Sequence, residues 1–145
     1  MAHVSNVARY FLSLAEEEAG DDVSNLKLQK LLYYAQGFHL ALFDKPLFTN
    51  EIRAWTHGPV VADVYHDYKR YGSGVIPRTE CELEALTTEE KELLDEVYQV
   101  YGQYSAWKLR NMTHEEAPWV NAYAQGADTV ISPAAMRDFF QTLVH

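Results

Sequence analysis

The sequence has little cysteine and no long apolar run. Its 145 residues contain one cysteine, Cys81, which excludes an internal disulfide and a zinc site built from cysteines. A membrane-spanning helix needs about 18 consecutive apolar residues, and no segment supplies them. The first residues also lack the basic stretch and apolar run of a signal peptide. We therefore expect a cytoplasmic protein without a membrane segment.

Basic residues are also scarce. The chain has 12 Lys and Arg against 21 Asp and Glu, a net charge of -9. Nucleic-acid binding depends on a concentrated Lys and Arg surface, and the only local basic groupings are Lys27 with Lys30 and Lys69 with Arg70. We therefore do not expect direct binding to DNA or RNA. A cationic protein partner fits this charge better.

The composition is otherwise that of one globular domain spanning residues 1–145. Hydrophobic residues make up 48% and charged residues 23%. Helical spacing of apolar residues, together with capping residues, predicts helices at residues 5–18, 26–43, 60–71, 88–101, 106–112 and 133–143. At most one short strand is expected, at residues 51–56. The fold class is therefore all-α, with about six helices. The sequence has no heptad repeat long enough for a coiled coil, so it does not indicate whether the chain self-associates.

Two local patterns leave alternatives open. Gly58 and Pro59 suit the cap and first turn of a helix, so His57 would lie at a helix N-terminus. That terminus could hold an anion or a partner's carboxylate through its free backbone N–H groups, or His57 and Trp55 could lock the turn through packing and one hydrogen bond. Gln29, Tyr33 and Gln36 lie on the flank of the helix at residues 26–43, where they could contact a partner or hydrogen-bond to nearby loop backbone.

Three ordered segments resemble one family. Residues 27–37 read KLQKLLYYAQG, residues 54–61 read AWTHGPVV and residues 113–119 read THEEAPW. Together they resemble the Panacea domain of SocA-like antitoxins, and the resemblance covers about residues 1–125. The residues that match the motifs, most of them interpreted as framework of the fold, are Lys27, Leu28, Gln29, Lys30, Leu31, Leu32, Tyr33, Tyr34, Gln36, Trp55, His57, Gly58, Pro59, Val60, Thr113, His114, Pro118 and Trp119.

The resemblance implies a function in binding. It implies an antitoxin that neutralises a co-encoded protein toxin by direct binding and is associated with prophages or other mobile elements. The alternative is a phage-associated adaptor or regulator that binds a host factor, including a proteolytic adaptor. The resemblance identifies neither the toxin nor the surface that binds it.

No catalytic constellation accompanies these motifs. His57, His114, Glu115 and Glu116 could meet as metal ligands, but no His and carboxylate pattern has metal-ligand spacing. A metal-dependent hydrolase is therefore the third hypothesis. We expect a protein that is not an enzyme and has no catalytic residue, metal or cofactor. Cys81 lies between two glutamates, where a thiolate is disfavoured.

Tyrosines supply the candidate partner-binding residues. Ten tyrosines in a small domain cannot all be buried without partners for their hydroxyl groups, and tyrosine is a common interface anchor. The hypothesis offers two sets, on two predicted helices: Tyr65, Tyr68 and Tyr71, or Tyr98, Tyr101 and Tyr104.

Overall fold

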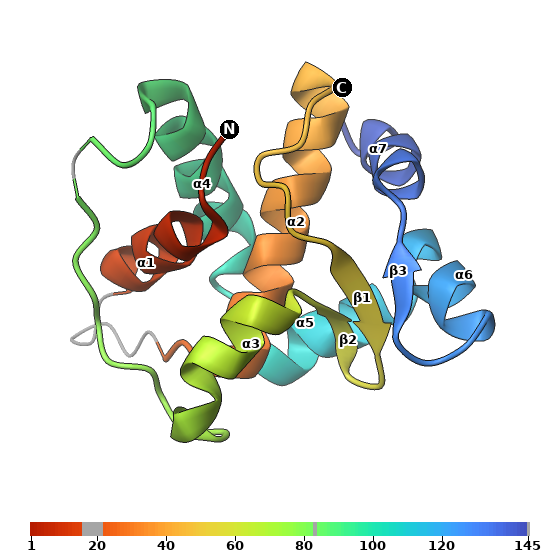
Figure 1. The fold of residues 1–145 in the computed structure, drawn as a ribbon, viewed down its shortest axis with the longest axis horizontal. Helices are drawn as coiled ribbons and strands as arrows, with labels where there is room; N and C mark the ends of the chain where they lie inside the picture. The colour runs from red at the N-terminus through yellow and green to blue at the C-terminus, as the bar shows by residue number, and fades with distance from the viewer. Residues whose placement is uncertain (16–21, 83, 145) are drawn as a thin grey trace.

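Helix α2 (Asn25–Phe43) forms the middle of the molecule, and the other elements pack around it (Figure 1). The structure is a computed structural model that describes residues 1–15, 22–82 and 84–144. Most of α2 is buried on every side from Leu28 to Gly37. A helix that is apolar almost all round is central in its bundle, as the sequence predicts for residues 26–43.

Six further α-helices occur in the described part of the chain, so the expectation of a mainly helical fold is confirmed. Helices α1 (Val4–Leu14) and α4 (Thr88–Tyr101) lie on one side of α2, and α7 (Pro133–Gln141) lies on the other (Figure 1). Helix α5 (Ala106–Thr113) also contacts α2. The remaining helices are α3 (Ala62–Tyr68), continued by the 3-10 turn η2 (Lys69–Tyr71), and α6 (Ala117–Ala124).

The close packing of α2 on α7 depends on Gly37. A Cβ atom placed on Gly37 would lie 2.1 Å from Phe140 Cε2, well inside van der Waals contact. The Phe140 ring is completely buried there and packs edge-on against Tyr33. Glycine lowers helix propensity at this position. Its lack of a side chain lets the Phe140 ring pack directly against the backbone of α2.

Serine and threonine caps begin several helices as the sequence predicts. The Thr87 hydroxyl accepts from the Glu90 backbone N–H, and the Glu90 carboxylate accepts from the Thr87 N–H, which is a complete capping box. Ser24, Ser105 and Ser132 cap α2, α5 and α7. In each case the serine hydroxyl accepts from a backbone N–H of the first turn. The predicted end of the first helix, near residue 18, lies outside the described residues.

A small antiparallel sheet replaces part of a predicted helix. Strands β1 (Ile52–Trp55), β2 (Gly58–Val60) and β3 (Thr129–Ile131) pair in the order β2-β1-β3. The strand expected at residues 51–56 is confirmed, but the helix expected from Pro59 begins only at Ala62. Gly58 has φ 110°, which closes the turn of a hairpin rather than a helix cap. Pro59 is tolerated because β2 is an edge strand.

Helix α6 was not predicted from the sequence, and neither was strand β3. Pro118 occupies the first turn of α6, where the missing N–H costs nothing. The described helices include none that is long and apolar enough to cross a membrane.

Candidate functional site

The first motif supplies polar side chains that are buried along α2. Gln29 Oε1 accepts from the Val61 backbone N–H at 2.9 Å, and its Nε2 donates to Asn25 Oδ1 at 2.9 Å. Asn25 Nδ2 in turn donates to the Tyr65 carbonyl oxygen at 3.0 Å. This chain of hydrogen bonds ties α3 to α2. Of the two alternatives for the flank of α2, hydrogen bonding to nearby backbone is therefore what Gln29 does, whereas Tyr33 bonds to the Glu116 carboxylate instead.

Gln36 and Lys27 have the same role elsewhere on the helix. Gln36 Oε1 accepts from the backbone N–H groups of Leu47 and Phe48 at 2.7 and 3.3 Å, and its Nε2 donates to the Phe48 carbonyl at 2.8 Å. Lys27 Nζ donates to the Gly102 carbonyl oxygen at 2.6 Å. Each bond fixes a loop that has no regular secondary structure of its own.

Tyr33 and Tyr34 share one carboxylate. Their hydroxyl groups donate to Glu116 Oε1 and Oε2 at 3.0 and 2.9 Å. Burial raises the pKa of Glu116 to about 7, against the two hydrogen bonds, which lower it. The Tyr34 ring also stacks on Tyr101 at a centroid distance of 3.9 Å. Sequence reasoning missed Glu116 as a partner of the first motif, although it lies inside the third.

The second and third motifs meet at the hairpin. Trp119 Nε1 donates to the Trp55 carbonyl oxygen at 2.8 Å. The His114 ring stacks on the Trp119 ring, with centroids 3.9 Å apart and planes inclined by 7°. These contacts fix the hairpin against α6. The prediction that His57 lies at a helix N-terminus is wrong, because His57 is exposed in the hairpin turn before β2.

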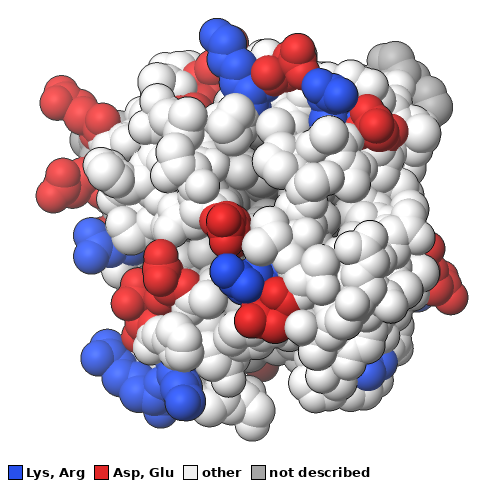
Figure 2. All heavy atoms as spheres, turned by 45° about the vertical axis from the view of Figure 1, so that its right-hand side comes forward, with Lys and Arg blue, Asp and Glu red and all other residues white. Residues whose placement is uncertain are grey.

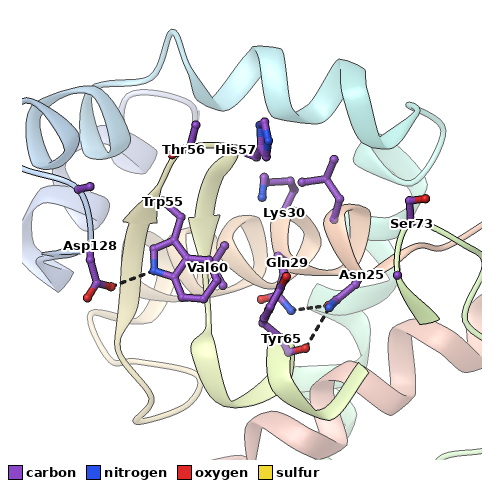
Figure 3. A pocket seen from close by; sticks show the side chains of 13 residues that line it. Asn25, Gln29, Lys30, Trp55, Thr56, His57, Val60, Tyr65, Ser73 and Asp128 are labelled. Carbon is purple, nitrogen blue, oxygen red and sulfur yellow. Dashed lines mark hydrogen bonds between the residues drawn. The ribbon is translucent and has the colours of Figure 1, made fainter. Parts of the chain in front are cut away.

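A cavity of about 500 Å³ opens beside this hairpin (Figure 3). The first motif contributes Gln29 and Lys30 to its lining, and the second contributes Trp55, His57 and Val60. Other lining residues include Leu26, Tyr65, Ser73 and Asp128. The walls are mainly apolar, as in typical ligand pockets. The motifs therefore build a cavity as well as a framework.

Basic groups gather at one end of this cavity. The Lys30 side chain is 0% exposed, and its Nζ donates to the Pro59 carbonyl oxygen at 3.1 Å. Burial, and then the charge of Arg110, lowers the pKa of Lys30 to about 7. Burial and the charges of Arg110 and Lys30 also lower the pKa of His114. In the described part of the chain, His114 Nε2 is buried without a hydrogen-bond partner.

An open apolar groove lies between α2 and α4. Its volume is about 390 Å³, and it includes side chains from the end of the chain as well. Leu42 is 47% exposed, Val100 49% and Leu143 41%. The lining residues are Phe38, Leu42, Leu93, Glu96, Val97, Val100, Tyr101 and Leu143. Exposed apolar side chains that share one groove are typical of an interaction site.

The six candidate tyrosines do not form one surface. Tyr65 lines the cavity, and Tyr68 packs beside Tyr71 with centroids 6.4 Å apart. Tyr101 lines the groove, whereas Tyr98 packs against Phe11. All six, including Tyr104, are half-buried. Their role in partner binding stays a prediction.

Other ligand chemistries find less support in the described residues. No group of three or more His, Cys, Asp or Glu side chains among them could hold a metal ion. Figure 2 shows one face of the molecule, on which basic side chains lie among acidic ones and form no continuous stripe. That face lacks the basic surface on which nucleic-acid binding depends.

Comparison with known proteins agrees with the three motifs. The family model described as "Antitoxin SocA-like, Panacea domain" matches residues 28–120. Antitoxin SocA of Caulobacter vibrioides (strain NA1000 / CB15N) is 30% identical over 119 residues, which cover 74% of this chain. The match covers 63% of that protein, so the chain spans less than two thirds of its relative's length. No solved structure gives a match. The chain belongs to the SocA-like antitoxin family, which is defined by the Panacea domain.

Proposed function

We propose that this protein is an antitoxin that neutralises a co-encoded protein toxin by direct binding, and that it acts by binding rather than by catalysis. Membership of the SocA-like family supports the antitoxin role. Association with a prophage or another mobile element is part of the same proposal. The observation that carries direct binding is the open groove between α2 and α4.

The groove has the properties of a docking surface. Leu42, Val100 and Leu143 expose apolar area that water does not solvate favourably. Covering such area stabilises a complex by roughly 25 cal/mol per Å² before the costs of association. Tyr101 lies in the same groove, so the α4 set of tyrosines is the better supported of the two candidate sets.

Charge indicates the kind of segment that would fill the groove. Glu96 lines it, and Glu92 and Asp95 are exposed on the same helix. The whole chain carries a net charge of -9. The occupant we propose is therefore a toxin segment with apolar anchors and flanking Lys or Arg residues, because opposite charges speed encounter and select the partner.

Substitution of two exposed valines tests the proposal. Val100→Asp places a charge in the groove, whereas Val120→Asp makes the same change on α6, where the valine is 39% exposed. Each variant is co-expressed with the neighbouring reading frame, and growth rescue and co-purification are measured. We expect Val100→Asp to abolish both and Val120→Asp to preserve both.

Two results would contradict the proposal at different levels. If Val100→Asp still rescues growth and co-purifies with the toxin, the toxin binds elsewhere. If the unmodified chain does not rescue growth when a neighbouring reading frame is expressed, the antitoxin function itself is wrong. The adaptor or regulator that binds a host factor then takes its place.

A further inference from the structure

The cavity lined by the first two motifs has basic groups at one end and apolar side chains along its walls. In Figure 3, Lys30 and His57 lie near each other at one end, with Trp55 and Val60 beside them. Arg110 adjoins this end, since its Nε lies 3.4 Å from His57 Nδ1. Basic side chains are therefore grouped beside an otherwise apolar space.

Acidic side chains do not balance this charge. Across residues 1–15, 22–82 and 84–144, none of Lys30, His57 and Arg110 forms an ion pair with a carboxylate. The Asp128 carboxylate also borders the cavity, but it accepts from Trp55 Nε1 at 2.9 Å and pairs with Arg53 at 3.4 Å. In a chain with excess acid, a basic cluster whose members form no ion pair in the described residues favours an anionic ligand.

Lys30 has hydrogen-bonding capacity to spare. An ammonium group has three donors, and Lys30 Nζ uses one of them, to the Pro59 carbonyl oxygen. The side chain is buried and borders the cavity, so a group that meets the other donors has to come from that space. Unmet donors on a buried charge are costly, and a carboxylate oxygen would form a strong bond with one of them.

We propose that the cavity binds a carboxylate carried on an apolar body, with the carboxylate toward Lys30 and His57. The body would lie against Trp55, Val60 and Tyr65, which line the rest of the space. Lys30 supplies an ammonium donor for a carboxylate oxygen, and His57 lies beside it at the same end. The site is independent of toxin neutralisation, and its test needs only the purified chain.

Matched acids and amides test the site. The probes are 3-phenylpropionate and acetyl-Gly-Gly-Phe, each compared with its amide, which keeps the apolar body and removes the charge. Binding is followed by NMR through the indole N–H signal of Trp55, identified with Trp55→Phe. We expect each acid to bind at least about tenfold more tightly than its amide. Equal binding of acid and amide, or no response of Trp55, overturns the proposal.

The two acids also distinguish two sources of the ligand. Tighter binding of the tripeptide identifies the C-terminus of a protein chain as the natural ligand. Equal or tighter binding of 3-phenylpropionate identifies a small carboxylic acid. Either result supports the site, because both ligands present the same group.

Substitution of Lys30 tests whether its ammonium group binds the carboxylate of the ligand. Lys30→Met removes the ammonium and keeps the length of the side chain, and we expect it to abolish the preference for the acid. Lys27→Met is the matched control on the same helix, because Lys27 bonds to Gly102 outside this cavity. A persisting acid preference in Lys30→Met contradicts the proposal.

A second variant covers the case in which Lys30→Met does not fold. His57 is exposed in the hairpin turn, so His57→Gln is expected to leave the fold intact. At pH 6 it should weaken binding of the acid by about threefold or more and leave binding of the amide unchanged. Unchanged binding of the acid in this variant counts against the site.

Discussion

The indole N–H of Trp119 on α6 donates to the backbone carbonyl of Trp55 on β1 across 2.8 Å. This single bond joins two of the three sequence motifs. The flat stacking of His114 on the Trp119 ring supports the same arrangement. Because both partners are buried or half-buried, losing the donor leaves a carbonyl oxygen without its hydrogen bond.

Trp119→Phe is expected to lower the free energy of unfolding by about 1–3 kcal/mol, since a donor is lost while an aromatic ring remains. The matched control is Trp107→Phe, because Trp107 is 54% exposed; a change within about 0.5 kcal/mol is expected there. Urea denaturation measures both. Equal losses in the two variants would show that the bond to Trp55 contributes nothing specific.

Gly37→Ala is expected to destabilise the fold by about 1–3 kcal/mol, because the added methyl group overlaps the Phe140 ring. The cost should be smaller in a Phe140→Leu background, where the methyl group finds room. A double-mutant cycle measures the difference. If the two changes are simply additive, the overlap is relieved by movement of the helices instead.

Glu116 makes stability depend on pH in the acid range. Its pKa is about 7 in the folded chain and 4.5 ordinarily, so between these values the folded state holds a proton that the unfolded state releases. The free energy of unfolding therefore falls as pH rises from about 4.5 to 7, by on the order of 1–3 kcal/mol.

Glu116→Gln removes this contribution, because glutamine does not titrate. Subtracting the variant's unfolding free energy from that of the unmodified protein at each pH cancels the effect of other groups, including His114. The difference should decline steadily between pH 4.5 and 7. A flat difference would mean that Glu116 titrates normally.

Lys30 produces the opposite trend at higher pH. Its pKa is about 7 in the folded chain against an ordinary 10.5, so above pH 7 the unfolded state binds a proton that the folded state does not. The free energy of unfolding should rise with pH by up to about 1.4 kcal/mol per unit. Lys30→Met should remove this rise.

The measurement compares the two proteins at pH 7, 8 and 9. It stops there because burial raises the pKa of Tyr33 and Tyr34 above 10, and their titration in the unfolded chain would then lower stability. Parallel curves for the unmodified protein and Lys30→Met would show that Lys30 keeps an ordinary pKa.

Helices with strong local signals could be predicted from the sequence, and so could the central position of α2. Thr87 and Glu90 specify their helix start within four residues. The hairpin could not be predicted in full, because Gly58 and Pro59 suit a helix start as well as an edge strand. The sheet also requires β3, whose Val130 pairs with Arg53 from far along the chain, and local sequence does not show that pairing.

The site was predictable to a smaller extent. The motif residues were expected as framework, and Gln29 and Gln36 do hold backbone groups. What sequence spacing could not show is that Lys30 and His57 meet at one cavity, or that Glu116 receives both tyrosine hydroxyls. These relationships join residues about 30 and 80 positions apart, and tertiary packing alone creates them.

The position of α2 at the centre affects how the molecule opens. Its polar side chains hold α3, the loop after α2, the loop after α4 and the start of α6. Detaching any one of these segments exposes a buried polar group together with apolar area. Partial opening is therefore costly everywhere around the helix, and the amide protons of α2 should exchange with solvent only when the whole chain unfolds.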